Sequence, residues 1–272
     1  MSFSATAKSI RRPLVSGNWK MNLDHIEALH LVRDLGLRLK PEDLKSTEVS
    51  LHPPFSDIRT VQTLLEGEKI PVSLGAQHCS DQDRGPFTGE VSPQMLSRLG
   101  VRYVIVGHSE RRELFHMSDE IVAQTLRAVV RNSMIPILCV GETALERDEG
   151  RTKDKLSLQL RTALEGLDVG LNSDSDFVSA FVVAYEPIWA IGTSQTPTGE
   201  EIEGICAFIR EVLADIFTKD YSREVRVQYG GSVNASNARD ILTLSNVDGL
   251  LVGGASLKAS DFVDIIRAGA TC

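Results

Sequence analysis

The chain has 272 residues, of which 42% are hydrophobic, and it carries a formal net charge of -8. This size allows one large hydrophobic core, and α/β barrels reach this length as a single domain. The negative charge argues against binding to nucleic acid or to an anionic membrane surface, because both require a basic stripe. The negative charge does not exclude a small phosphorylated substrate, since a pocket can be locally positive within an acidic protein.

The cysteines and the N-terminal residues give information about where the protein is located in the cell. No pair of cysteines has Cys-x-x-Cys spacing, so we interpret all four as reduced thiols. They are Cys79, Cys139, Cys206 and Cys272. Residues 1–12 lack acids and are rich in Ser, which is compatible with a transit peptide or with a short disordered arm. We expect a flexible arm over 1–12, a catalytic domain over 13–272, and a cytoplasmic protein.

Apolar, β-branched runs alternate with helical patterns along the whole chain. The predicted strands are residues 14–19, 48–52, 72–77, 103–106, 135–140, 177–185, 225–229 and 247–252. The predicted helices are residues 24–40, 55–66, 119–132, 152–166, 199–217, 235–244 and 260–268. This α/β alternation matches a single (β/α)8 TIM barrel, with eight parallel strands and outer helices, better than an open doubly wound sheet.

A barrel of this kind also predicts where the reactive residues lie. Catalytic groups in such folds follow the C-terminal ends of the strands. Polar and Gly-rich motifs do follow the apolar runs: Asn18-Trp19-Lys20, Gln77-His78, Gly107-His108-Ser109-Glu110, Gly141-Glu142, Glu186, Gly230-Gly231-Ser232 and Gly253-Gly254. We therefore expect these residues to converge on one mouth of the barrel.

Glu186 is the first candidate for chemistry. It ends the apolar run 177–185, between Tyr185 and Pro187. At the end of a buried strand, its carboxylate should be partly desolvated, which would raise its pKa and suit it to proton abstraction. An isolated Glu is more often an exposed acid in a turn, but this context favours a general base.

Two glycine pairs indicate a phosphate site. Gly230-Gly231-Ser232 and Gly253-Gly254 follow the seventh and eighth predicted strands. Glycine allows backbone N–H groups to approach an anion, and the loops after these strands bind phosphate in many barrel enzymes. A purely structural strand-to-helix turn is the alternative at each pair.

Lys20 and His108 complete the candidate site. At a mouth that binds phosphate, Lys20 would neutralise phosphate and developing enolate charge, although an isolated Lys is usually solvated. Ser109 could cap a short helix, whose N-terminus would keep His108 a neutral hydrogen-bond donor. A base, a neutral imidazole, a lysine and a phosphate clamp suit proton transfer α to a carbonyl. No metal site is predicted.

The motifs at these positions together resemble the triosephosphate isomerase family. They are Gly17-Asn18-Trp19-Lys20-Met21-Asn22, Gly107-His108-Ser109-Glu110-Arg111-Arg112, residues 184–193, Tyr229-Gly230-Gly231-Ser232-Val233 and Val252-Gly253-Gly254-Ala255. The resemblance extends from about residue 13 to residue 269. It implies interconversion of dihydroxyacetone phosphate and glyceraldehyde 3-phosphate through an enediolate, without a cofactor.

The same resemblance implies a role for each site residue. Glu186 is the base, and His108 polarises the carbonyl group. Asn18 and Lys20 stabilise the oxyanion, and Glu110 orients the site. The phosphate-binding amides are those of Gly192, Ser232, Gly253 and Gly254.

Two loops also acquire roles from the resemblance. Residues 187–197 would form a lid, although Ser194, Gln195 and Pro197 depart from the usual hinge sequence. The polar loop that begins at Asp81 and ends at Glu90 would project into the other subunit of a homodimer. His78 and Pro86 replace the residues usual near that loop.

Two other functions remain open from sequence. An isomerase of a longer phosphorylated ketose, such as a tetrulose phosphate, would use the same clamp and base. A catalytically silent barrel would bind without chemistry, but the loss of Glu186, His108 or Lys20 would mark it, and all three are present.

Overall fold

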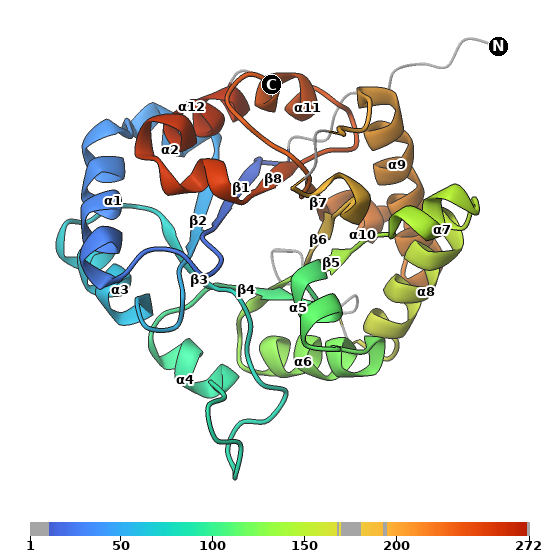
Figure 1. Ribbon diagram of the computed structural model, residues 1–272, viewed down its shortest axis with the longest axis horizontal. Coiled ribbons are helices and arrows are strands. Elements are labelled where there is room, and N and C mark those ends of the chain that lie inside the picture. Colours follow the sequence, from blue (N-terminus) through green and yellow to red (C-terminus); the bar gives the residue numbers. More distant parts are fainter. Residues whose placement is uncertain (1–10, 168, 170–180, 193–194, 271–272) are drawn as a thin grey trace.

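A computed structural model describes residues 11–167, 169, 181–192 and 195–270. Eight parallel strands form a closed barrel in which each strand pairs with its sequence neighbours and β1 closes on β8 (Figure 1). The strands are β1 (Leu14–Asn18), β2 (Glu48–His52), β3 (Ser73–Ala76), β4 (Tyr103–Val106), β5 (Ile135–Val140), β6 (Val182–Tyr185), β7 (Arg226–Tyr229) and β8 (Gly249–Val252). The predicted single (β/α)8 barrel is confirmed.

Helices form an outer ring around the barrel (Figure 1). The longer ones are α1 (His25–Arg38), α3 (Ile58–Gly67), α6 (Asp119–Arg131), α8 (Thr152–Leu164), α9 (Gly199–Ile216) and α12 (Ala259–Gly269). The shorter ones are α2 (Pro41–Ser46), α4 (Pro93–Arg98), α5 (Ser109–Leu114), α7 (Ala144–Asp148), α10 (Lys219–Glu224), α11 (Ala238–Leu242), and the 3-10 turns η1 (Ile188–Ala190) and η2 (Gly254–Leu257). Among the described residues, no helix is long and apolar enough to cross a membrane.

Local sequence signals explain where the long helices begin. The Asp24 side chain caps α1 by accepting hydrogen bonds from the amides of Ile26 and Glu27. The Glu27 carboxylate in turn accepts a hydrogen bond from the Asp24 amide. Thr198 and Glu201 form the same reciprocal capping box at the start of α9. Each box satisfies backbone N–H groups that the first turn leaves without intrahelical partners.

The strands alternate between two hydrophobic environments. In β6, Val182 and Ala184 belong to a cluster inside the barrel, whereas Val183 and Tyr185 pack in the larger core between strands and helices. Successive side chains of a strand point to opposite faces. Continuing this alternation by one step beyond the strand points Glu186 to the barrel interior.

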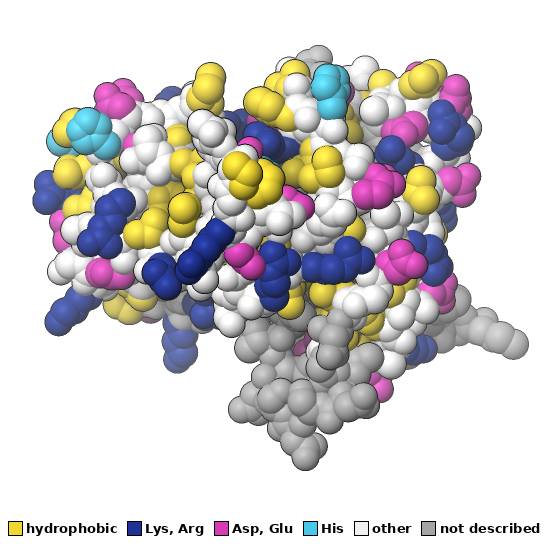
Figure 2. Space-filling view, turned by 90° about the horizontal axis from the view of Figure 1, so that it is seen from below, with side chains coloured by type: hydrophobic (Ala, Val, Ile, Leu, Met, Phe, Trp, Pro, Cys, Tyr) yellow, Lys and Arg dark blue, Asp and Glu magenta, His cyan; other side chains and the backbone are white. Residues whose placement is uncertain are grey.

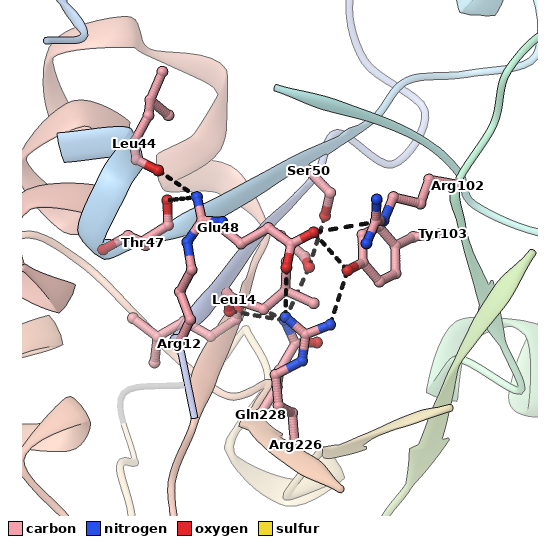
Figure 3. A network of polar contacts seen from close by, with 12 residues as sticks. Arg12, Leu14, Leu44, Thr47, Glu48, Ser50, Arg102, Tyr103, Arg226 and Gln228 are labelled. Atoms are coloured by element: carbon pink, nitrogen blue, oxygen red, sulfur yellow. Dashed lines mark hydrogen bonds and ion pairs between the residues drawn. The ribbon is translucent and has the colours of Figure 1, made fainter. Parts of the chain in front are cut away.

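A polar network closes the base of the barrel, at the N-terminal ends of the strands (Figure 3). The Glu48 carboxylate accepts from the Tyr103 hydroxyl at 2.7 Å and pairs with the Arg226 guanidinium at 2.7 Å. Arg226 also donates to the Tyr103 hydroxyl at 2.8 Å. Side chains of β2, β4 and β7 are thereby joined, which stabilises the barrel on the face opposite its mouth.

Arg11 and Arg12, the first described residues, contact the same end of the barrel, where the strands begin. Arg11 pairs with the buried carboxylate of Asp248 at 2.7 Å, and Arg12 donates to the backbone oxygens of Leu44 and Thr47. Residues 1–10, which make up most of the predicted arm, lie outside the described residues. The division into an arm and a catalytic domain stays a prediction.

Residues 81–90 project from one edge of the molecule, at the bottom of Figure 1. The loop is held at its base by Asp83, whose carboxylate accepts from Arg131 at 3.1 Å and from Asn132 at 2.9 Å. Figure 2 views the molecule from this side, and both hydrophobic and basic side chains lie on the face it shows. Exposed hydrophobic side chains of this region include Phe87 and Met95.

Candidate active site

A cavity of about 330 Å³ lies at the C-terminal ends of the strands. It is lined by Asn18, Lys20, His108, Glu186, Ile191, Gly192, Gly230, Gly231, Ser232, Val233, Leu251, Gly253, Gly254 and Ala255. Five of the seven motifs predicted to converge on one mouth therefore contribute residues to this cavity, whereas Gln77-His78 and Gly141-Glu142 are not among its described lining residues. Glu110 is not among these described lining residues, but its carboxylate lies 2.6 Å from Lys20 Nζ at the edge of the cavity.

Glu186 is fixed by the strands on both sides of β6. The Glu186 amide donates to the Val140 carbonyl at 2.8 Å, and Glu186 as a whole is only 2% exposed to solvent. Two glycines make room for it: a Cβ on Gly141 would lie 1.8 Å from the Glu186 backbone oxygen, and one on Gly230 would lie 3.0 Å from Glu186 Cγ. The position of the carboxylate is thus determined by close backbone packing rather than by its own rotamer alone.

Both oxygens of the Glu186 carboxylate have partners. Oε1 lies 3.0 Å from His108 Nε2, and Oε2 accepts from the Ser109 amide at 2.9 Å. From the sequence, Ser109 is predicted only as a helix cap. The position of Ser109 as the first residue of α5 could have suggested an anion-binding amide, because the first N–H groups of a helix point away from it.

The predicted rise in the pKa of Glu186 is wrong for this state of the site. Burial does raise the pKa of the carboxyl, but the adjacent His108, the Ser109 amide and Lys20 outweigh burial and lower it below its ordinary value. Desolvation at the end of β6 can be predicted from the sequence, whereas these hydrogen-bond donors come from a distant part of the chain. An ionised carboxylate is the form that can abstract a proton, so this correction is compatible with the role of a base.

His108, and not Ser109, caps the helix α5. The His108 ring nitrogen Nδ1 accepts from the Glu110 amide at 3.2 Å. This backbone donor requires a lone pair on Nδ1, so the neutral ring carries its proton on Nε2 and donates it to Glu186. Burial disfavours the imidazolium, but the carboxylates of Glu186 and Glu110 outweigh burial and raise the pKa of His108.

The turn at Gly107 aims His108 into the cavity. In β4, Val104 and Val106 face the outer core while Tyr103 and Ile105 face the barrel interior. Strict alternation would therefore send His108 outward. Gly107 has a φ of +72°, a conformation that residues with a side chain rarely adopt, and it interrupts the strand alternation before His108.

Lys20 reaches the cavity from a strained backbone. Its φ is +53°, and its amide donates to Asn18 Oδ1 at 3.1 Å. Asn18 also lines the cavity, so its side chain connects the cavity wall to the Lys20 backbone. The ion pair with Glu110 then directs the ammonium group toward the site.

The predicted lid begins directly after Glu186. The indole of Trp189, in η1, donates to Glu142 Oε1 at 2.8 Å, and the Tyr185 hydroxyl donates to the same oxygen at 3.1 Å. Gly192 lines the cavity with a φ of +71°. Ser194, where the lid hinge departs from the family pattern, lies outside the described residues.

Comparison with known proteins agrees with this geometry. A family model described as triosephosphate isomerase matches residues 13–269. A triosephosphate isomerase of Cutibacterium acnes is 46% identical over 258 residues, which cover 94% of this chain and 97% of that protein. Another, from Saccharopolyspora erythraea, is 46% identical over 255 residues, covering 94% and 95% of the two chains.

A solved structure is similar over the same length. The crystal structure of triosephosphate isomerase from Bartonella henselae has a TM-score of 0.82 and 35% sequence identity, and the match covers 94% of this chain and 98% of that one. The chain belongs to the triosephosphate isomerase family.

Proposed function

We propose that this chain is an aldose–ketose isomerase that interconverts dihydroxyacetone phosphate and D-glyceraldehyde 3-phosphate, a reaction of glycolysis and gluconeogenesis. The observation that supports this most directly is the contact between Glu186 and His108. A buried carboxylate lies 3.0 Å from an imidazole whose proton faces it, within a cavity that also contains Lys20. This arrangement suits general acid/base catalysis without a cofactor.

In this proposal, the substrate enters between Glu186 and His108 and replaces their mutual contact. Glu186 removes a proton from one carbon and returns it to the neighbouring carbon. His108 donates its Nε2 proton toward the carbonyl oxygen, and Lys20 and Asn18 stabilise the negative charge of the enediolate. Glu110 holds Lys20 in place through their 2.6 Å ion pair.

The phosphate group would bind at the glycine-rich rim. Gly192, Ser232, Gly253 and Gly254 all line the cavity that contains Glu186. Their backbone amides, together with Lys20, supply positive potential in a protein with net negative charge. Lid residues 187–197 would close over the bound phosphate and exclude water.

A coupled assay tests the activity. Dihydroxyacetone phosphate and a tetrulose phosphate are each incubated with the chain, and the appearance of the aldose is followed by oxidation of its aldehyde group with an auxiliary dehydrogenase and NAD+. We expect rapid turnover of the triose phosphate only. Turnover of the tetrulose phosphate alone would move the assignment to the longer ketose, and no turnover of either would contradict the isomerase.

We further propose a homodimer in the cytoplasm, formed through residues 81–90. Support comes from the projection of this loop and from exposed hydrophobic side chains around it. Phe87 is 44% exposed, Met95 58% and Phe115 62%. Burial of such side chains against a second copy would remove apolar surface from water.

A further inference from the structure

The side chain of Arg112 connects the turn before His108 to the neighbouring strand β5. Its Nε donates to the Gly107 carbonyl at 2.8 Å, and its Nη2 donates to the Cys139 carbonyl at 3.4 Å. Its Nη1 forms an ion pair with Asp119, the first residue of α6. One planar guanidinium thus joins the end of β4, the end of β5 and the first turn of α6.

Arg112 holds both peptide groups that flank the His108 Cα. Its side chain binds the Gly107 carbonyl, and its backbone amide donates to the His108 carbonyl at 3.1 Å. Glycine has more backbone freedom than any other residue, so the turn at Gly107 is the least constrained point before His108. A Cβ on Gly107 would lie 3.1 Å from Arg112 Nη2, so the missing side chain lets the guanidinium approach. The direction of the imidazole therefore depends on Arg112.

The contact with β5 leads toward the proposed base. Cys139 precedes Val140, whose carbonyl accepts from the Glu186 amide at 2.8 Å. By binding both the Gly107 turn and β5, the guanidinium fixes how far this turn lies from the strand that holds Glu186. The 3.0 Å distance between His108 Nε2 and Glu186 Oε1 follows from that separation.

Arg112 does not itself reach the reacting groups. It is absent from the described residues that line the active-site cavity. Its side chain, which is 13% exposed, borders a separate cavity of about 390 Å³ next to α5, α6 and α8. Any effect of Arg112 on the reaction must therefore pass through His108 or Glu186.

We propose that Arg112 is a positioning residue for His108, which fixes the distance of the imidazole from the Glu186 carboxylate. The inference rests on the proposed isomerase function and adds a residue to it. Without the guanidinium, the turn at Gly107 is free to rotate. This rotation moves His108 Nε2 away from the place that the substrate carbonyl oxygen would occupy.

The test is Arg112→Ala with and without added guanidinium. The truncated side chain leaves a space that opens to the 390 Å³ cavity, so that a guanidinium ion can enter it. Arg161→Ala, at an exposed position on α8, is the matched control. We measure kcat, KM and inhibition by inorganic phosphate, in guanidinium chloride at non-denaturing millimolar concentration and in ammonium chloride at the same concentration.

We expect Arg112→Ala to lower kcat by about 10²-fold, the loss that follows a displacement of roughly 1 Å in an active site. Inhibition by phosphate should stay native, because Arg112 does not contact the glycine-rich rim. Guanidinium should restore part of kcat and ammonium should not, because only the planar ion can donate to both carbonyls. Arg161→Ala should behave as the native chain does in both salts.

A double-mutant cycle assigns the loss to the imidazole. In the His108→Asn background, Arg112→Ala should cause a much smaller loss of kcat than in the native chain. A native kcat in Arg112→Ala, or an equal loss in both backgrounds, would overturn the proposal. A parallel loss of kcat and of phosphate inhibition that guanidinium does not restore would also overturn it, because it would indicate a general loss of structure.

A second variant keeps the test decisive if Arg112→Ala does not fold. Arg112→Lys keeps a positive charge beside Asp119, but one ammonium group does not span two carbonyls, so the same coupled loss of kcat is expected. The native chain is assayed in parallel with triose phosphate. Absence of turnover there would refute the isomerase function, whereas a loss that does not depend on His108 in an active enzyme refutes only the role of Arg112.

Discussion

His108 Nε2 lies 3.0 Å from Glu186 Oε1, and both side chains are almost completely shielded from water. The contact explains how a carboxylate can be buried and still ionised: the Nε2 proton of His108 and the Ser109 amide replace its lost hydration. It also means that the proposed acid and the proposed base satisfy each other until a substrate separates them.

This pairing predicts the titration of Glu186. Replacing His108 by Asn removes the imidazole that lies against the carboxylate, while the burial that raises its pKa remains. The pKa of Glu186 should therefore lie below the ordinary value in the native chain and rise in the variant. Carbon-13 NMR of labelled Glu carboxyl groups measures both, with exposed His116→Asn as the control. An unchanged pKa in His108→Asn would contradict the pairing.

A second prediction concerns acid stability. Burial lowers the pKa of His52 to about 4, from an ordinary value of 6.5, so the folded chain binds this proton more weakly than the unfolded chain does. The stabilisation is complete above pH 6.5 and is lost as the pH falls toward 4, by roughly 3 kcal/mol in all.

His52→Asn should reduce this loss, while His30→Asn at an exposed position should not. The measurement is urea unfolding at pH 7 and pH 4.5, at one fixed protein concentration. Residual acid sensitivity is expected in every variant, because burial also lowers the pKa of His78 to about 4. An identical pH dependence in His52→Asn and the native chain would refute the role of His52.

Two glycines should respond to alanine with opposite signs. A Cβ on Gly141 would lie 1.8 Å from the backbone oxygen of Glu186, so Gly141→Ala should displace Glu186, lower kcat and destabilise the fold by about 1–3 kcal/mol. Gly204 lies on the exposed side of α9 with nothing within 4 Å of such a Cβ. Gly204→Ala should stabilise the chain by about 0.5–1 kcal/mol, because alanine favours the helix.

Thermal unfolding and steady-state kinetics of both variants check this pair. A fully active Gly141→Ala would show that the position of Glu186 tolerates a shift of its backbone.

The projecting loop provides a fourth test. Replacing residues 81–90 by a short Gly-containing turn should yield a monomer with little activity, because the proposed interface loses the loop that includes Phe87. Leu158→Asp changes an exposed hydrophobic side chain on α8 and serves as the control. This variant should sediment with the same mass as the native dimer. Sedimentation velocity distinguishes the two. A shortened-loop chain that still sediments as an active dimer would exclude this loop as the interface.

The sequence alone was sufficient for the architecture and for the convergence of the site. The predicted strands over 103–106 and 135–140 coincide with β4 and β5, because continuous apolar runs mark strands buried on both faces. The predicted strand over 48–52 coincides with β2, in which apolar and polar residues alternate. The short helices α2, α4, α7 and α10 were not predicted. Helices of five or six residues are too short to display a hydrophobic period.

The electrostatic state of the site could not be predicted in the same way. The pKa of Glu186 depends on Ser109 and His108, which approach it from another strand across 77 or more positions of sequence. The capping of α5 by His108 likewise depends on a backbone conformation set at Gly107. Composition and spacing predict which residues gather at a barrel mouth, but not which donor faces which acceptor.

The central claim, that Glu186 is the base, is tested most directly by hydrogen exchange. Dihydroxyacetone phosphate is incubated in deuterated water with the native chain, with Glu186→Gln, or with the exposed control Glu211→Gln on α9. A proton carried by a carboxyl group exchanges with solvent, so deuterium should enter the carbon bound to the hydroxyl group. We predict exchange at the same rate in the native chain and the control, and a rate lower by about 10²–10⁴-fold in Glu186→Gln. Exchange at the native rate in Glu186→Gln would contradict the account.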